Sequence, residues 1–494
     1  MVNDSLKRKT IMGTVWKFME RMSNQIISFI VSIILGRLLL PEDYGIIALV
    51  SVFITICDKL VVSGFATSLI QKKDADNVDF STVFFFSLAM SLVLYAAMFF
   101  SAPLIADFYS AYDRELLISV IRVMSIQLII TAVNSVQSAY VSRTMQFKKT
   151  FIVAICSTLL SAIVGIGMAY AGYGVWALVA QNCVSAGSIM IIMWLIIGWR
   201  PQLKFSFQKF KSLFAYGWKI FAASIIKVLY NELRSIVIGK AYTPADLAFY
   251  NKGQSFPLII ESNVGGTIDS VLFPAISKTQ DSKDGMRLVL RRAIKTTTYV
   301  LMPLFMGLAA VSEPLIKILL TEKWLPCVPY MQILCFAFMF MPIEIDNLQA
   351  IKAMGRSDIA LKLEIIKKVI GVALLIVSIP FGVKAIALSM LIGAIVNAIV
   401  DALPNRKLLG YKFSHQIVDI FPNFLLSLVM FGCVYALSFL NINVFALLAL
   451  QIASGAAIYL ILSVTFKIES FNYILNTLKS ILNRNKNVQK GDIL

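Results

Sequence analysis

The chain has 494 residues, of which 59% are hydrophobic and only 15% are charged, with a formal net charge of +18 at pH 7. A water-soluble protein of this length could not bury so much apolar surface, so this composition excludes a large soluble enzyme. It predicts an all-α integral membrane protein with little mass outside the bilayer.

Long apolar segments follow one another from the N-terminus almost to the end of the chain. We expect the first to be a membrane helix rather than a cleaved signal, because it is long and carries Lys17, Glu20 and Arg21. About 14 segments reach the roughly 20 residues that a membrane-spanning helix needs. They lie at residues 11–39, 45–70, 81–106, 115–139, 150–170, 175–197, 213–239, 247–275, 293–319, 324–350, 361–379, 385–401, 415–440 and 444–466.

Basic residues alternate from one connection to the next. The N-terminus, every second loop and the tail hold 27 Lys and Arg, whereas the other loops hold only Arg114, Lys240, Lys323 and Lys384. Because basic loops stay on the cytoplasmic side, this pattern predicts that both termini are cytoplasmic. The basic residues therefore reflect topology and contact with anionic lipid, and we expect no nucleic-acid partner.

Several motifs of soluble chemistry are absent or isolated. The sequence has no G-x-x-x-x-G-K-[ST] motif for nucleotide binding, and its single histidine, His415, cannot form a metal cluster. Asp74 and Asp76 resemble a sugar-nucleotide D-x-D motif, but their loop of about ten residues favours a solvated turn. The six cysteines contain no CxxC pair and fit small packing residues. We expect no cofactor and no catalytic residues.

One motif occurs twice in the sequence. Residues 32–43 match residues 235–246 at a constant offset, with Gly36, Pro41 and Asp43 repeated as Gly239, Pro244 and Asp246. Both copies follow a helix predicted to start in the cytoplasm, which indicates a parallel repeat with an axis along the membrane normal. We therefore expect an N-lobe (1–200), a C-lobe (201–402), two appended helices (403–466) and an amphipathic, basic cytoplasmic tail (467–494).

These motifs also carry a resemblance. Residues 35–49, residues 249–258 (FYNKGQSFPL) and residues 271–277 (VLFPAIS) resemble the multidrug/oligosaccharidyl-lipid/polysaccharide exporter superfamily. Within it they are similar to the Wzx-type flippases of the lipopolysaccharide biosynthesis branch. The resemblance covers essentially the whole chain and implies two pseudo-symmetric six-helix lobes plus two C-terminal helices.

Ionisable residues inside a membrane are costly and mark functional sites unless they pair with one another. Two predicted helices of the repeat carry polar side chains at helical spacing, so that each set shares one face. As substrate-binding residues of a central cavity we select Lys17, Arg21, Asn24, Lys227, Asn231, Arg234 and Lys252. As ion-coupling or charge-pairing residues we select Glu20, Asp58, Lys59, Glu232, Glu261 and Asp269.

Two interpretations of these residues remain open. In one, the cationic side chains line a cleft between the lobes and bind the pyrophosphate of a lipid-linked saccharide. In the other, Lys17 with Glu20 and Arg21, Asp58 with Lys59, and Glu232 with Arg234 neutralise each other within a lobe.

The resemblance implies a flippase that moves undecaprenyl-pyrophosphate-linked oligosaccharide repeat units across the bacterial cytoplasmic membrane by alternating access. The product would be capsule, O-antigen or exopolysaccharide. Membrane lipids and a polysaccharide polymerase or export machinery are the implied partners. The alternatives are a cation-coupled multidrug or small-molecule exporter of the same superfamily and a membrane saccharide polymerase. No predicted outside loop exceeds about ten residues, which argues against the polymerase.

Overall fold

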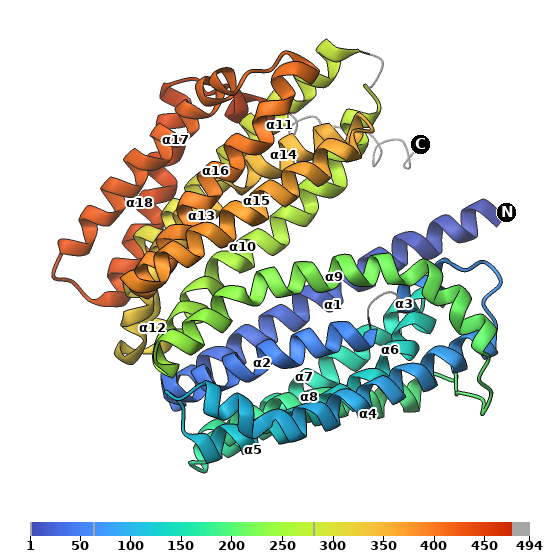
Figure 1. Cartoon of the computed structure of the whole chain (residues 1–494). Helices are drawn as coiled ribbons and strands as arrows, with labels where there is room; N and C mark the ends of the chain where they lie inside the picture. Colours follow the sequence, from blue (N-terminus) through green and yellow to red (C-terminus); the bar gives the residue numbers. More distant parts are fainter. Residues whose placement is uncertain (1, 63–64, 280–281, 477–494) are drawn as a thin grey trace, which may run out of the picture. The chain divides into compact units, whose positions relative to one another are not determined.

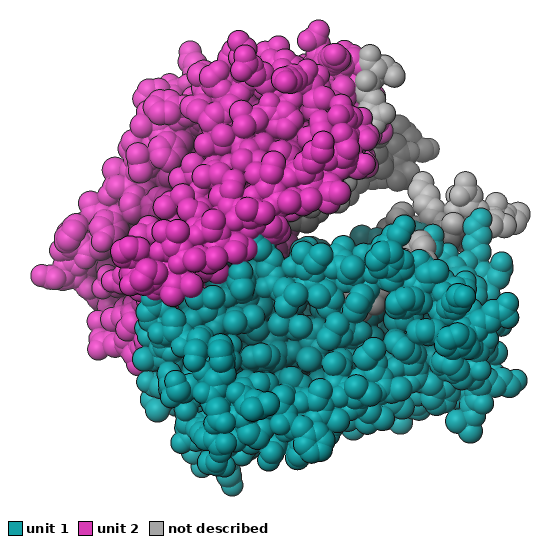
Figure 2. All heavy atoms as spheres, viewed as in Figure 1, with its two compact units in different colours: residues 1–248 teal, residues 249–494 magenta. Residues whose placement is uncertain are grey.

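The computed structural model describes residues 2–62, 65–279 and 282–476, without the side chains of 2–9, 11, 66, 216 and 264–271. Within these residues the secondary structure is helical, with no strand. The all-α fold class predicted from the composition is therefore confirmed. The chain folds into two compact units, residues 1–248 and 249–494 (Figure 2).

The first unit is a bundle of nine helices among the described residues, and it also contains the first residues of α10 (Figure 1). The helices of this unit are α1 (Val2–Leu38), α2 (Pro41–Val62), α3 (Phe65–Gln71), α4 (Asn77–Phe108), α5 (Arg114–Met124), α6 (Ile126–Thr144), α7 (Phe147–Tyr170), α8 (Val175–Ile196) and α9 (Phe207–Ala241). The boundary between units follows α9, whereas we predict the lobe boundary before it, at residue 200. The lobe division describes the sequence repeat and remains a prediction.

The second unit contains the remaining helices. They are α10 (Pro244–Ser277), α11 (Lys283–Ala310), α12 (Ser312–Leu320), η1 (Glu322–Cys327), α13 (Val328–Phe338), α14 (Met341–Ala353), α15 (Ser357–Ser378), η2 (Ile379–Phe381), α16 (Val383–Leu409), α17 (Phe413–Ala436), η3 (Leu437–Phe439) and α18 (Val444–Thr465). The described start of the predicted tail is helical over residues 469–476, and its remainder lies outside the described residues.

Eleven helices among the described residues are long and apolar enough to cross a membrane. The number is twelve if α9, which bends by 55° between Ala215 and Gly217, counts as one span. The predicted number of 14 is therefore not confirmed. Two predicted segments, 247–275 and 361–379, coincide with α10 and α15, which are helical but fall outside this set. Both carry ionisable residues in their interiors, which lowers their hydropathy.

Aromatic packing anchors the start of α9 to neighbouring helices of the first unit. The ring of Phe210 lies 4.6 Å from that of Phe86 and 5.7 Å from that of Phe65, measured between centroids. Ser206 caps the helix by accepting a hydrogen bond from the backbone N–H of Lys209. The Phe-rich stretch around these residues therefore packs on helices α3 and α4.

The two copies of the repeated motif lie side by side in the first unit. α2 packs against α9, and Gly45 of α2 touches the backbone of Pro244, where α10 begins. In turn, Gly239 near the end of α9 lies against the Leu49 side chain. The C-terminal ends of α1 and α9 thus lie at the same end of this unit (Figure 1). A glycine lies at each close approach: Gly45 just after the first copy, and Gly239 within the second.

Gly45→Ala adds a single methyl group and is nevertheless expected to destabilise the protein measurably. A Cβ at this position would lie 1.9 Å from the Pro244 carbonyl oxygen, so a helix backbone must move. Overpacking of this kind costs about 1–3 kcal/mol. Thermal unfolding of the purified protein in detergent measures the effect. Gly187→Ala in α8 is the matched control, because nothing lies within 4 Å of its added Cβ. Equal melting temperatures for the two variants would contradict the contact.

Candidate functional site

The polar face of α1 packs partly against α7. The Lys17 ammonium lies 3.0 Å from the Glu20 carboxylate, which also accepts a 2.6 Å hydrogen bond from the Thr150 hydroxyl. One turn further, the Thr158 hydroxyl donates a hydrogen bond to the side-chain oxygen of Asn24. The pairing interpretation therefore applies to Lys17 and Glu20, which neutralise each other.

The same face of α1 also borders a hollow. A shallow pocket of about 350 Å³ is lined by Glu20, Arg21, Asn24, Gln25 and Ser28. Arg21 is exposed, and Asn24 is half-buried. An Arg and an Asn at the wall of an open pocket can donate hydrogen bonds to an anionic group. Arg21 and Asn24 are thus the selected residues of α1 whose placement fits substrate binding.

On α9, Lys227 and Asn231 are exposed, whereas Glu232 and Arg234 are half-buried. Among the described residues no ion pair joins Glu232 to Arg234, and the buried Nε of Arg234 has no hydrogen-bond acceptor. The predicted pairing of these two side chains is therefore not seen. The Arg234 Nε–H is therefore a donor without a partner in the described structure.

In α2, Asp58 is half-buried and Lys59 is exposed. Thr131 of α6 hydrogen-bonds to the Asp58 carboxylate. The Oδ1 atom of Asp58 has no hydrogen-bond partner in the described structure. No ion pair between Asp58 and Lys59 occurs in the described part of the chain. A carboxylate that is partly desolvated and incompletely satisfied suits proton or cation exchange.

The other selected residues belong to the second unit. The Lys252 ammonium lies 5.3 Å from the centroid of the Trp324 ring, a cation–π contact, and Glu261 is half-buried. The Asp269 side chain lies outside the described residues. The single cavity predicted for Lys252 together with Arg21 and Lys227 remains a prediction.

A buried charge cluster in the second unit includes two residues that our sequence analysis did not select. Lys367 of α15 is 7% exposed and Asp401 of α16 is fully buried, with 2.8 Å between Nζ and Oδ2. Lys367 also lies 2.8 Å from Glu364, and Glu344 of α14 is near enough to interact electrostatically. Lys367 interrupts the predicted segment 361–379, and Asp401 ends the segment 385–401. A charge at such a position could have identified both residues.

A hydrogen-bonded polar seam continues from this cluster. Asn405, one turn after Asp401, donates to the Asn347 side chain at 2.7 Å, and Asn347 exchanges two hydrogen bonds with Gln416 of α17. All three side chains are fully buried. Hydrogen bonds among these buried amides fix the packing of α14, α16 and α17, although the Asn405 Oδ1 atom has no hydrogen-bond partner in the described structure. The second unit therefore contains a buried polar seam within a largely apolar core.

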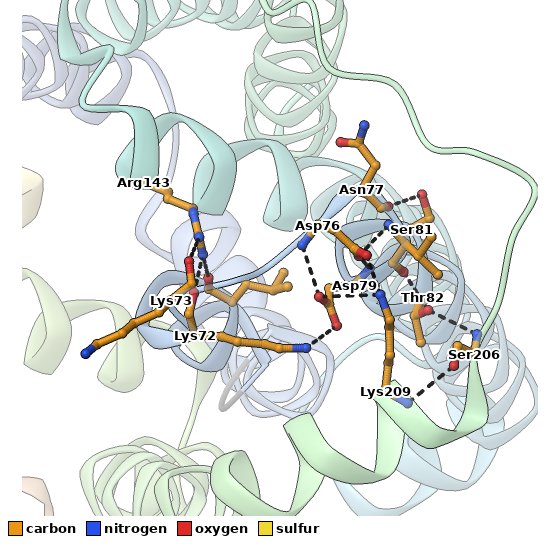
Figure 3. Close-up of polar contacts among 12 residues, drawn as sticks. Lys72, Lys73, Asp76, Asn77, Asp79, Ser81, Thr82, Arg143, Ser206 and Lys209 are labelled. Carbon is orange, nitrogen blue, oxygen red and sulfur yellow. Dashed lines mark hydrogen bonds and ion pairs between the residues drawn. The ribbon is translucent and has the colours of Figure 1, made fainter.

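The D-x-D residues have a structural role at the start of α4. The Asp76 carboxylate caps this helix by accepting from the backbone N–H groups of Val78 and Asp79, and it lies 2.5 Å from the Lys209 ammonium (Figure 3). The fully buried Asp79 pairs with Lys72 at 2.7 Å. The expectation of a turn at this position agrees with these contacts.

Arg143 of α6 completes this polar cluster. Its guanidinium donates to the backbone carbonyls of Leu69, Lys72 and Lys73 at 2.6–2.8 Å (Figure 3). These carbonyls end α3 and would otherwise lack intrahelical partners. Lys72, Lys209 and Arg143 therefore hold the end of α3 and the starts of α4 and α9 together.

Acid is expected to weaken this cluster. The hydrogen bond from Lys209 and the Asp79 backbone N–H lower the pKa of Asp76 to about 2. Because the folded-state pKa lies below the ordinary value of 3.8, the stabilisation is present above pH 4 and is lost as the pH falls toward 2. Melting curves from pH 5 to pH 2 should therefore fall less steeply for Asp76→Asn than for wild type. Asp74→Asn should follow wild type; identical curves for all three would contradict this assignment.

Comparison with known proteins places the chain in a family. A model described as "Polysaccharide biosynthesis protein" matches residues 34–329. The lipopolysaccharide biosynthesis protein WzxC of Escherichia coli (strain K12) is 23% identical over 441 residues, 88% of each chain. The teichuronic acid biosynthesis protein TuaB of Bacillus subtilis (strain 168) is 24% identical over 477 residues, 93% of this chain and 96% of the relative.

Two solved structures with a similar fold are a flippase and a multidrug transporter. The inward closed conformation of the lipid II flippase MurJ aligns with a TM-score of 0.73 at 16% identity, covering 92% of this chain and 98% of that one. An inward-facing multidrug resistance MATE family transporter of the MOP superfamily aligns with a TM-score of 0.60 at 17% identity, covering 81% and 98%. At these identities the likeness concerns the fold.

Proposed function

Because the chain belongs to the polysaccharide biosynthesis protein family, we propose that it flips undecaprenyl-pyrophosphate-linked oligosaccharide repeat units across the bacterial cytoplasmic membrane. The product would be capsule, O-antigen or exopolysaccharide. The observation that carries this proposal is the alignment with WzxC and TuaB, which extends over most of each chain. The likeness in fold to a lipid II flippase supports it.

The mechanism we infer is alternating access, in which the substrate binds at a polar site that opens to one side of the membrane at a time. Arg21, Lys227, Arg234 and Lys252 bind the pyrophosphate, and Asn24 and Asn231 hydrogen-bond to polar groups beside it. Arg21 at an open pocket and Arg234 with an unsatisfied buried Nε support this assignment. Lys17 belongs to the same face, although its charge is already paired with Glu20. The energy comes from substrate charge or an ion gradient, with Asp58 and Glu232 as coupling residues.

A cation-coupled multidrug or small-molecule exporter is the second candidate, supported by the likeness in fold to the MATE transporter. The saccharide polymerase is not supported, since the fold resembles that of a flippase and of a transporter rather than that of a polymerase. A polymerase or export complex would instead act as a partner on the outer side.

Depletion of this chain in its host tests the substrate. We expect lipid-linked repeat units to accumulate on the inner leaflet while surface polysaccharide falls. Re-expression of wild type should reverse both effects. Unchanged polysaccharide together with increased sensitivity to cationic drugs would favour the exporter instead.

The proposed orientation places both termini in the cytoplasm. Single cysteines at Asp113 and Asn441, in a background without the native cysteines, should react with an impermeant thiol reagent added to intact cells. A cysteine at Lys283 should react only after the membrane is permeabilised. The reason is the concentration of Lys and Arg in the loops on the side of Lys283. Labelling of the Lys283 position from outside would reverse the orientation.

A further inference from the structure

A pocket separate from the selected residues lies between α11 and α17 in the second unit. Its volume is about 490 Å³, within the range of small-ligand sites. The lining residues are Asp284, Arg287, Leu288, Arg291, Tyr411, His415, Val418 and Asp419. Neither the sequence repeat nor the proposed cleft accounts for this pocket.

The floor of the pocket is a fixed hydrogen-bonded group. Arg291 donates to both carboxylate oxygens of Asp419 at 2.8–3.0 Å, and the Tyr411 hydroxyl donates to the same carboxylate at 2.8 Å. Lys295 lies 3.6 Å from Asp419 as well. The negative charge of Asp419 is therefore neutralised by its own neighbours, and this group holds the wall of the pocket in place.

Arg287 is the cation of this pocket that remains available. Its guanidinium lies over the Tyr411 ring, 5.9 Å from the centroid, and no carboxylate pairs with it among the described residues. The exposed His415 imidazole lines the same pocket. Of the five cations at the start of α11, Arg291 and Lys295 pair with Asp419 and Glu469. The other three are Lys283, Arg287 and Arg292, and they are accompanied there by one acid, Asp284. The site therefore offers planar N–H donors in a positive field, which suits a phosphate group.

The rim of the pocket is apolar and exposed. Val418 is 70% exposed and Leu288 is 45% exposed, and Phe421, one turn further along α17, is 54% exposed. Both α11 and α17 are candidate membrane spans, so these side chains face acyl chains when the protein is in a bilayer. The Arg287 cation beside an exposed apolar rim matches an amphiphile, in which a phosphate is joined to hydrocarbon, better than a free anion.

We infer that this pocket binds the phosphate of an anionic phospholipid of the inner leaflet, with Arg287 and His415 as its donors. In the orientation proposed above, α11 and α17 both start on the cytoplasmic side, at the depth where lipid phosphates lie. This inference uses that orientation and does not depend on the transported substrate. It gives the second unit a lipid contact that can influence its packing or activity.

Lipid binding to the purified full-length protein tests the inference. The probes are dioctanoyl phosphatidylglycerol, dioctanoyl phosphatidylcholine and inorganic phosphate, with bound molecules counted by native mass spectrometry. Wild type should prefer phosphatidylglycerol to phosphatidylcholine. Arg287→Gln should weaken phosphatidylglycerol binding by about fivefold, and Arg287→Lys should weaken it less. The matched control is Arg292→Gln, which removes the same charge from an exposed position of α11 outside the pocket.

Three results would overturn the inference. Equal losses for Arg287→Gln and Arg292→Gln would show that diffuse surface charge attracts the lipid. Equal binding of the two lipids would show that the pocket does not recognise an anionic headgroup. Displacement of the lipid by millimolar inorganic phosphate would identify a free-anion site. Thermal unfolding of each variant verifies that it is folded, and Arg287→Lys keeps the test valid if Arg287→Gln is unstable.

Discussion

Replacement of Lys367 by Met is expected to destabilise the protein by about 3–5 kcal/mol. The ammonium is the charged partner nearest to the fully buried Asp401, whose Oδ1 atom already has no hydrogen bond in the described structure. Without Lys367, an uncompensated carboxylate remains in a low-dielectric interior beside Glu344, so it must take up a proton or leave the interior.

Thermal and denaturant unfolding in detergent measure this effect, with Lys362→Met as the control. Lys362 lies on the same helix but is exposed. The double variant Lys367→Met with Asp401→Leu should recover much of the lost stability, since it removes both charges and leaves apolar side chains. Equal melting temperatures for Lys367→Met and Lys362→Met would show that the buried pair contributes little.

Arg21→Gln and Lys227→Gln are each expected to reduce export of lipid-linked saccharide by about tenfold or more. Charge-assisted hydrogen bonds contribute about 1.5–3 kcal/mol, and a neutral amide cannot replace them toward a pyrophosphate. Arg21→Lys should retain more export than Arg21→Gln, because charge matters more than size. The assay is the amount of lipid-linked repeat unit that accumulates on the inner leaflet.

Lys219→Gln is the control for these variants, since Lys219 is an exposed residue earlier on α9. It should export wild-type amounts. If Arg21→Gln and Lys227→Gln are expressed normally and export as much as Lys219→Gln, the cationic site is wrong, and mutual charge pairing explains these residues.

The sequence predicted the features that depend on local pattern. Apolar length identified an all-helical membrane chain, and the repeated Gly-basic-x-x-x-Pro-x-Asp motif pointed to two equivalent turns, which lie side by side in the first unit. The spacing of Lys17 and Glu20 placed them on one face, and they form an ion pair. Helical periodicity is a short-range property, so one sequence is enough to reveal it.

Long-range partners could not be predicted in the same way. Nothing in the sequence near Lys367 indicates that Asp401, on the next helix, lies 2.8 Å away. Nor does the sequence indicate that α7 supplies hydrogen-bond partners to Glu20 and Asn24. The predicted number of 14 spans is not confirmed, because length and composition alone do not count α10 and α15, whose interiors carry charges, among the membrane helices. Pairing between helices depends on tertiary packing, which no local pattern encodes.

Reconstitution tests the central proposal most directly. Purified protein is placed in vesicles that contain a fluorescent undecaprenyl-pyrophosphate-linked saccharide in both leaflets, and an impermeant quencher is added outside. Wild-type protein should carry probe from the inner to the outer leaflet, so that the quencher removes the fluorescence of both leaflets. Arg21→Gln should slow this loss of fluorescence. If wild-type vesicles keep the same protected inner-leaflet signal as protein-free vesicles, whatever ion gradient is applied, the chain is not a flippase for this class of lipid.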